Sequence, residues 1–247
     1  MRKIVLIVGL ILTQFCFSAD FEKGVACYVN NDFDCAFNVF NSLAQKGDLA
    51  AQLNLGKMYQ HGKGVKQDDS KAFEWFRKAA KQGNSDAQFY IGVMYQHGTG
   101  VKQDDSKAFE WIRKAAKQGD PTAQFSLAVR YQLGKGVKQD YFKAFEWYRK
   151  AAEQGNSDAQ FRVGLMYSEG HAVKQDDSKA LEWYLKAAEQ RHPIAQLNLA
   201  VRYYYGEDVN QDYFKALEWY LKAAEQGNSD AQFQVGFMYS EGHGVKQ

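Results

Sequence analysis

The sequence predicts an all-α protein built from a repeated helix-turn-helix motif. Its five tryptophans are spaced 36 residues apart: Trp75, Trp111, Trp147, Trp183 and Trp219. A fixed period between about 20 and 50 residues is typical of repeat proteins, whose single repeats are too small to bury an apolar face alone. Each repeat carries two segments with helical spacing of apolar residues, and no segment alternates long enough to predict a strand.

The repeats fill the chain after residue 47. Five full repeats and a partial one follow one another at 48–83, 84–119, 120–155, 156–191, 192–227 and 228–247. Residues 20–47 form a degenerate repeat that we expect to cap the N-terminal end. The array exceeds the three or so repeats that such a stack needs for stability, so we expect one elongated domain.

The first helix is clearest in the second repeat. Ala87, Ile91 and Tyr95 lie at i, i+4 and i+8, which aligns them on one face of a helix. Gly98 then favours the left-handed backbone that commonly ends a helix. We therefore predict a helix that ends at Gly98 and a polar turn after it.

The second helix begins after this turn. Asp104 and Ser106 can accept hydrogen bonds from the free amides of its first turn. Its apolar stripe consists of Ala108, Trp111, Ile112, Ala115 and Ala116. Because the tryptophan of every repeat occupies this stripe, we predict that all five belong to the core between helices and do not form a ligand surface.

The first 19 residues have the features of a secretory signal peptide. Arg2 and Lys3 precede an apolar stretch from Ile4 to Leu12, and small residues follow at Ser18 and Ala19. This stretch is too short to span a bilayer, which takes about 20 residues, so we expect no transmembrane segment in the mature chain. We expect a periplasmic or secreted protein.

The charge of the mature chain argues against a nucleic-acid partner. Removing residues 1–19 takes away Arg2 and Lys3 and no acidic residue, so 31 basic residues fall to 29, equal to the 29 acidic ones. Strong binding to a nucleic-acid backbone needs an excess of basic side chains. We therefore expect no nucleic-acid partner.

Residues 51–247 follow a pattern shared with a known repeat family. The pattern is A-x-x-x-L-G-x-x-Y-x-x-G-x-G-V-x-x-D-x-x-K-A-x-x-W-Y-x-K-A-A-x-x-G, and it resembles the Sel1-like repeat, a relative of the tetratricopeptide repeat. The resemblance implies a right-handed α-solenoid that serves as an adaptor or interaction scaffold, often secreted or periplasmic in bacteria. Ala172 and Asp208 replace the second turn glycine, and Arg191 replaces the closing glycine, so we expect strained or differently shaped turns there.

Two cysteines remain after the predicted cleavage. Cys27 and Cys35 flank the first hairpin turn. In an oxidising compartment a disulfide would fasten the N-terminal repeat, and the alternative is two free thiols. The Helicobacter cysteine-rich proteins, which the chain resembles in repeat type, pair cysteines at this separation, although theirs join one repeat to the next.

No motif predicts catalysis, and we expect no enzymatic activity, no cofactor and no metal. Paired aspartates such as Asp68 and Asp69 recur with the turns and are better explained as helix caps. His61 and His97 lie two helix spacings apart, each about 8 to 10 Å, which is too far to share a zinc ion. Serines such as Ser70 precede lysine directly and do not form the serine-x-x-lysine motif. Because some Helicobacter relatives were linked to β-lactam binding or hydrolysis, weak β-lactam activity is the enzymatic alternative.

Comparison between repeats favours binding to a protein or peptide. With the first residue of each repeat as position 1, three positions of the first helix vary while the core positions hold. Position 7 is Asn54, Tyr90, Ser126, Arg162, Asn198 or Gln234. Position 11 alternates between methionine and arginine, as Arg130 or Arg202. Position 14 is His61, His97, Leu133, Glu169, Tyr205 or Glu241. Steps of four and three place these positions on one stripe, which we predict to be rotated away from the core.

We expect this stripe to line a concave face. First helices commonly form the concave groove of solenoids, and Arg and Tyr are enriched at interface hot spots. The predicted contact residues are Tyr90, Arg130, Arg162, Arg202 and Tyr205. The alternatives are a solvated face that has drifted, or a purely structural component of the envelope.

The last repeat stops at Gln247, before the second helix that would cover Phe233, Val235 and Phe237. Solenoids usually need a polar terminal cap. Either another chain covers these side chains, or the sequence is incomplete.

Overall fold

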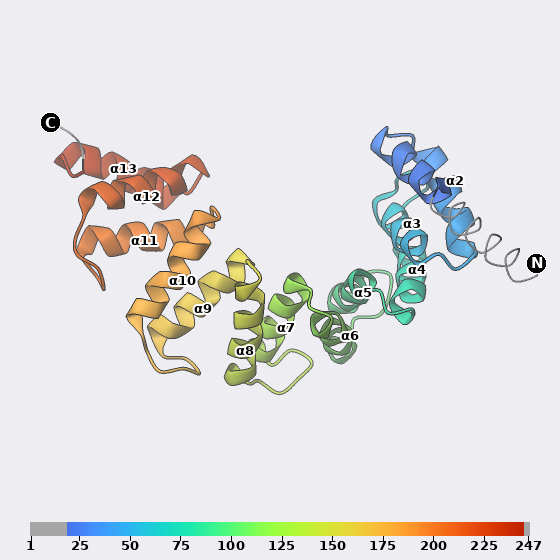
Figure 1. The fold of residues 1–247 in the computed structure, drawn as a ribbon, viewed down its shortest axis with the longest axis horizontal. Helices are drawn as coiled ribbons and strands as arrows, with labels where there is room; N and C mark the ends of the chain where they lie inside the picture. Colours follow the sequence, from blue (N-terminus) through green and yellow to red (C-terminus); the bar gives the residue numbers. More distant parts are fainter. Residues whose placement is uncertain (1–18, 245–247) are drawn as a thin grey trace, which may run out of the picture. The chain divides into compact units, whose positions relative to one another are not determined.

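The computed structural model describes residues 19–244, and every regular element within them is a helix (Figure 1). The N-terminal repeat consists of a helix over residues 19–29 and α2 (Phe33–Gln45). The first helices of the other repeats are α3 (Leu49–His61), α5 (Ser85–His97), α7 (Pro121–Leu133), α9 (Ser157–Glu169), α11 (Pro193–Tyr205) and α13 (Ser229–Glu241). The second helices are α4 (Asp69–Lys81), α6 (Asp105–Lys117), α8 (Tyr141–Glu153), α10 (Asp177–Glu189) and α12 (Tyr213–Glu225).

The predicted all-α repeat array is therefore confirmed. The predicted signal peptide lies outside the described residues, apart from its last residue, Ala19. Among the helices of residues 19–244, none combines the length and the apolar character needed to cross a membrane.

Side chains cap the helices at the places that the sequence predicts. Asn84 accepts a hydrogen bond from the Ala87 amide at 2.7 Å at the start of α5, and Asp104 accepts from the Lys107 amide at 2.9 Å at the start of α6. Gly98 ends α5 with a φ of 71°, in the left-handed region. The same caps recur along the array, so the first aspartate of each pair is explained by capping.

The second glycine of the turn lies close to a neighbouring backbone in the second repeat. A Cβ atom at Gly100 would lie 2.2 Å from the carbonyl oxygen of Asp69, at the start of the preceding second helix. Ala172 and Asp208, which replace this glycine, still adopt positive φ angles of 61° and 60°. Arg191 does the same at the closing position, with a φ of 65°. These three residues therefore keep the glycine conformation, at a cost of about 1 to 2 kcal/mol each.

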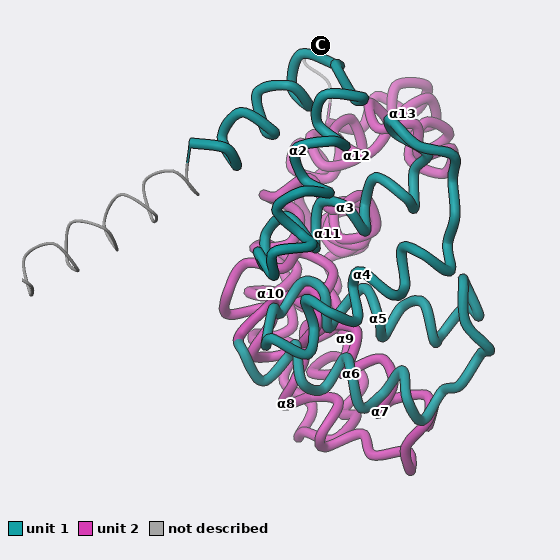
Figure 2. The backbone as a smooth tube through the Cα atoms, turned by 90° about the vertical axis from the view of Figure 1, so that its right-hand side faces the viewer, with its two compact units in different colours: residues 1–118 teal, residues 119–247 magenta. Residues whose placement is uncertain are grey.

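The chain divides into two compact units, an N-terminal unit that ends at Gln118 and a C-terminal unit that begins at Gly119 (Figure 2). The single elongated domain expected from the sequence stays a prediction. Within each unit, first helices pack against second helices, as α5 does against α4 and α6. The core of each unit therefore runs between the two kinds of helix.

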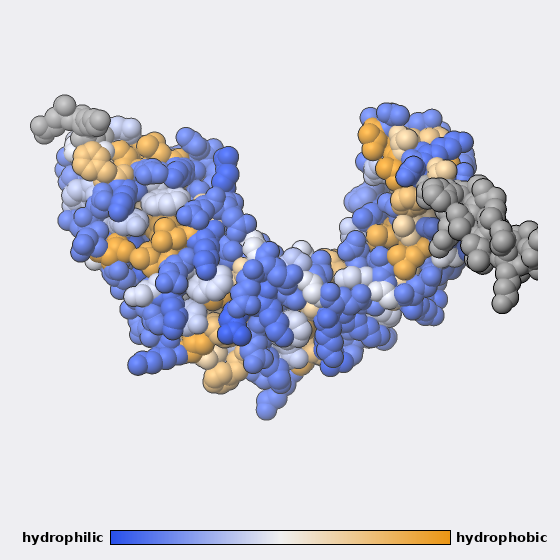
Figure 3. All heavy atoms as spheres, viewed as in Figure 1, coloured by the Kyte–Doolittle hydropathy of each residue, from blue (hydrophilic) through white to orange (hydrophobic). Residues whose placement is uncertain are grey.

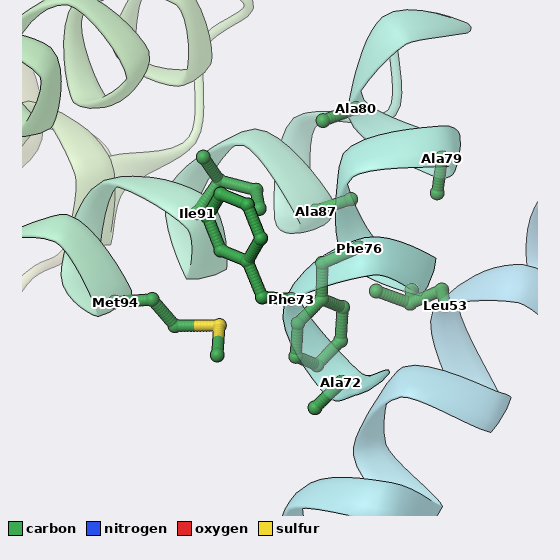
Figure 4. Packing of buried hydrophobic residues seen from close by; sticks show 9 residues of the cluster. All are labelled: Leu53, Ala72, Phe73, Phe76, Ala79, Ala80, Ala87, Ile91 and Met94. Atoms are coloured by element: carbon green, nitrogen blue, oxygen red, sulfur yellow. The ribbon is translucent and has the colours of Figure 1, made fainter. Parts of the chain in front are cut away.

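One core cluster of the N-terminal unit is formed by three consecutive helices. Phe73 and Phe76 of α4 pack with Leu53 of α3 and with Ile91 and Met94 of α5 (Figure 4). Phe76 and Ile91 are completely buried. The regular spacing of the apolar residues thus becomes a continuous apolar layer between helices.

The most deeply buried aromatic position of the second helix is the residue after the tryptophan. Tyr148, Tyr184 and Tyr220 are each 1% exposed, whereas the tryptophans are only half-buried. Each tryptophan packs on a core cluster, and a lysine ammonium lies 3.7 to 4.4 Å from its ring centroid. These lysines are Lys78, Lys114, Lys150, Lys186 and Lys222. The tryptophans therefore form the edge of the core, not its centre.

A relay of glutamine side chains joins consecutive helices. Gln160 of α9 donates to the Ala152 carbonyl at the end of α8, at 3.1 Å, and accepts from Gln190 after α10, at 2.7 Å. The same two bonds are made by Gln52, Gln88 and Gln196. Each relay adds a hydrogen bond to a carbonyl at a helix end, which also accepts from the backbone amide three residues later. The signal in the sequence was glutamine at positions 5 and 35 of every full repeat.

Cys27 and Cys35 form a disulfide, with their Cα atoms 5.8 Å apart. The bond joins the helix over residues 19–29 to α2. Within residues 19–244, one group of three potential metal ligands lies close together, namely Cys27, Asp32 and Cys35. Both of its sulfur atoms are already used in the disulfide.

Candidate partner-binding face

The predicted contact residues lie on first helices of both compact units, and three of them reach solvent. Arg162 on α9 is exposed, and Tyr205 at the end of α11 exposes 63% of its surface. Tyr90 on α5 is half-buried: its ring stacks on Phe76 with centroids 4.8 Å apart, and Lys57 Nζ lies 5.5 Å from its centroid. Tyr90 is therefore held in place, while Arg162 and Tyr205 are open to a partner.

Arg130 and Arg202 are buried, so their predicted place on a solvent-facing stripe is wrong. Arg130 is 2% exposed and Arg202 is 8% exposed. Arg130 Nη1 donates a hydrogen bond to the Lys135 carbonyl oxygen at 3.4 Å. Position 11 follows the buried position 8 by three residues, a spacing that keeps it on the same apolar face. Other repeats bury a methionine there, such as Met94 and Met166. The variable stripe that reaches solvent is therefore positions 7 and 14, hereafter the first-helix stripe.

Arg202 is fixed by contacts within the C-terminal unit. Its Nε donates to Asn198 Oδ1 at 3.0 Å, its Nη2 donates to Ser168 Oγ at 3.1 Å, and its Nη1 pairs with the Asp208 carboxylate. The guanidinium also lies 5.2 Å from the ring centroid of Tyr184. Asp208 is the residue that replaces a turn glycine. The ion pair therefore explains why an aspartate is held in a left-handed conformation at this turn.

Arg162 affects two titratable groups near it. Burial raises the pKa of Tyr148 to about 12, and the positive charge of Arg162 acts in the opposite direction. Burial also lowers the pKa of His192, which the nearby Asp158 raises and Arg162 lowers further. The guanidinium of Arg162 is exposed and can bind a carboxylate through two parallel N–H···O hydrogen bonds.

His192 caps α11, where the other first helices of the repeats use aspartate or asparagine. Its Nδ1 accepts from the Ala195 amide at 3.1 Å, and its Nε2 lies 3.2 Å from Asp158 Oδ1. The ring stacks on Phe161 with centroids 4.9 Å apart and is only 9% exposed. The neutral ring with its proton on Nε2 satisfies both contacts, because Nδ1 must stay unprotonated to accept.

Acidification is expected to destabilise the protein through His192. Burial, with Arg162, holds the pKa of folded His192 below its ordinary value of 6.5. The unfolded chain therefore binds more protons, and the free energy of unfolding falls as the pH drops below about 6.5. His192→Asn restores the cap found on α5 and α9, and it should remove this part of the pH dependence. Urea unfolding at about pH 7.5 and about pH 5.5 measures the free energy of unfolding of both proteins. An equal fall in this free energy for the original chain and the variant contradicts the prediction.

A cleft of about 360 Å³ lies in the C-terminal unit, at the ends of α10 and α12. Trp219 lines it together with two basic residues, Arg191 and Lys222, and two acidic ones, Glu189 and Glu225. Its charges balance, and its lining contains no serine, cysteine or histidine that could act as a nucleophile or general base. The cleft offers a mixed aromatic and polar surface and no catalytic arrangement.

Comparison with known families accounts for the repeat. The Sel1 repeat model matches residues 49–84, 85–120, 121–156, 157–192, 193–228 and 229–247. The chain belongs to the Sel1 repeat family. Each Sel1 match begins one residue later than the repeat limits taken from the sequence. No curated protein matches the chain.

Two solved Sel1 structures are similar in fold and sequence. A protective antigen present in uropathogenic Escherichia coli strains, which displays an SLR fold, is 40% identical with a TM-score of 0.88; the match covers 92% of this chain and 49% of the antigen. A Sel1 repeat protein from Oxalobacter formigenes is 39% identical with a TM-score of 0.83, over 90% of this chain and 91% of that one. This chain thus spans about half the length of the antigen. An immunity protein from Pseudomonas aeruginosa, 21% identical with a TM-score of 0.50 over 85% of this chain and 81% of its own, shares the fold alone.

The surface of the Sel1 repeats is mostly hydrophilic on the face shown in Figure 3, and apolar residues gather there in separate patches. The residues that recur from repeat to repeat form the core, the caps and the glutamine relay. Those at positions 7 and 14 of the first helices change instead. This division between constant and variable positions is the feature on which a functional assignment can rest.

Proposed function

We propose that this Sel1 protein is a non-catalytic scaffold that binds a protein or peptide partner through its first-helix stripe. The observation that carries the proposal is the contrast between positions. Position 14, which is exposed in all six repeats, holds histidine, leucine, glutamate or tyrosine, while the buried alanine of position 4 never changes. Residues that maintain the stack are fixed, and residues that reach solvent are free to match a partner.

Two side chains of the C-terminal unit are the proposed anchors. Arg162 offers a guanidinium that can bind a carboxylate of the partner in a bidentate manner. Tyr205 offers a large ring with a hydroxyl group, a combination that is enriched at interface hot spots. In the N-terminal unit, Tyr90 is a separate candidate contact. Arg130 and Arg202 contribute indirectly, since they hold the hairpin turns from within.

We place this scaffold in the bacterial envelope or outside the cell. The proposal rests on the predicted signal peptide, residues 1–19, and is supported by the bond between Cys27 and Cys35. Disulfides persist in oxidising compartments such as the periplasm and are rare in the cytosol.

The combined substitutions Arg162→Ala and Tyr205→Ala are expected to weaken partner binding by about tenfold or more, as for hot-spot residues. The partner is first captured by crosslinking the protein in its own compartment and identified by mass spectrometry, and affinity is then measured with purified components. Arg149→Ala, an exposed arginine on second helix α8, is the matched control and should bind normally. Equal affinity of the double variant and the control would exclude the first-helix stripe as the binding face.

A further inference from the structure

Two tyrosine-phenylalanine pairs open second helices of the C-terminal unit. Tyr141 and Phe142 begin α8, and Tyr213 and Phe214 begin α12, whereas α4, α6 and α10 begin with aspartate and serine. Phe142 exposes 71% of its surface and Phe214 exposes 61%. The two phenylalanines occupy equivalent places 72 residues apart. The same exposed apolar residue therefore recurs at the start of two second helices.

The tyrosines fix the backbone that carries these phenylalanines. Tyr213 stacks on His243 of the next turn, with ring centroids 4.3 Å apart and parallel planes, and its hydroxyl accepts from Gln211 at 3.1 Å. Tyr141 accepts from Gln139 at 3.0 Å in the same way. Because both pairs are held by their own turns, little conformational entropy remains to be lost when a partner binds.

The turns that precede the two pairs carry opposite charges. Residues 134–143 contain three lysines and one aspartate, and residues 206–215 contain three acidic residues and one lysine. Lys143 pairs with Asp140, Lys215 with Asp212, and Asp208 with Arg202. Outside these three ion pairs, the first turn keeps Lys135 and Lys138 and the second keeps Glu207. Lys135 and Lys138 of the basic turn and Glu207 of the acidic turn are exposed. The same molecule therefore presents two copies of one apolar element, one beside a basic turn and the other beside an acidic turn.

We propose that residues 134–143 and 206–215, hereafter the turn edge, form a self-association surface through which two copies of the chain pair about a two-fold axis. The basic turn of each copy faces the acidic turn of the other, and Phe142 packs against Phe214 of the second copy. A two-fold axis makes this contact twice, as isologous dimers require. Burial of the phenylalanines supplies affinity, and charge complementarity supplies register and orientation. This surface shares no residue with the first-helix stripe, but it adjoins the stripe at Tyr205, which directly precedes residue 206.

Sedimentation velocity over a range of concentrations tests the pairing. The purified protein is expected to pass from monomer to dimer, and the dimer should weaken as salt is raised. Phe142→Ser and Phe214→Ser introduce the residue that Ser106 and Ser178 provide in other repeats, and each is expected to weaken the dimer about 10- to 100-fold. An unchanged melting curve shows that these variants fold. A chain that stays monomeric at hundreds of micromolar, or a serine variant that associates as the original does, overturns the proposal.

Charge reversal tests the two-fold arrangement itself. The variant with Lys135→Glu and Lys138→Glu and the variant with Glu207→Lys should each fail to dimerise alone, because like charges then face each other in both contacts. Mixed in equal amounts they should form a heterodimer, since both contacts become attractive again. No association in the mixture, or growth beyond a dimer, overturns the two-fold pairing. The proposal is also overturned if the protein stays monomeric and uses this edge to bind only vesicles of phosphatidylethanolamine and phosphatidylglycerol, or only an unrelated protein.

Discussion

Replacing Tyr148 with alanine is expected to lower the free energy of unfolding by about 3 to 5 kcal/mol, more than the same change at the neighbouring Trp147. Tyr148 is 1% exposed, its ring centroid lies 5.5 Å from that of Phe125, and its hydroxyl donates to Gln132 Oε1 at 2.6 Å. Trp147 is half-buried, with Lys150 over its outer face, so its removal leaves a cavity that solvent can partly fill.

Urea unfolding followed by circular dichroism measures both substitutions. Tyr148→Phe is the control: it keeps the ring, loses the hydroxyl contact, and should cost about 1 kcal/mol. Phe76 occupies the equivalent place in the first full repeat, so the ring alone is compatible with the fold. A loss at Trp147→Ala that exceeds the loss at Tyr148→Ala would show that the tryptophan, and not its neighbour, is the main core residue.

Asp208→Gly is expected to destabilise the C-terminal unit by about 3 kcal/mol, although glycine is the usual residue at this turn. The substitution relieves the left-handed backbone, but it leaves the guanidinium of Arg202 in the interior without its carboxylate. Arg202→Met should cost less, because the Asp208 carboxylate that it leaves behind is partly exposed.

The double variant with Arg202→Met and Asp208→Gly restores the residues found in other repeats, and it should be about as stable as the original chain. Replacing a buried ion pair by apolar packing is often neutral or stabilising, so the two substitutions should be strongly non-additive. A double-mutant cycle in urea at neutral pH measures this coupling. Losses that simply add would mean that the two residues act independently.

The repeat could be predicted from the sequence because its signals are local. The 36-residue period, the capping residues and the glycines each act within a few residues of their own position, and the structure confirms the helices that they predict. The division into two compact units could not be predicted, because it depends on contacts between residues of different repeats.

The candidate site was harder to predict, because variation between repeats does not distinguish an exposed position from a buried one. Arg130 and Arg202 are charged, yet both lie on the buried face of their helices. The arginine at 202 and the aspartate at 208 were each visible as a departure from the repeat. Only the structure shows that one departure compensates for the other. The sequence does not reveal the glutamine relay, because an uncharged amide side chain fits an exposed position as well as a buried one.

The relay of glutamines gives the gene freedom to change length. Each full repeat brings the same donor and the same acceptor, so a crossover between any two copies rejoins a glutamine with an equivalent carbonyl and an equivalent glutamine. Whole repeats can therefore be gained or lost by recombination without leaving a polar group unsatisfied at the new junction.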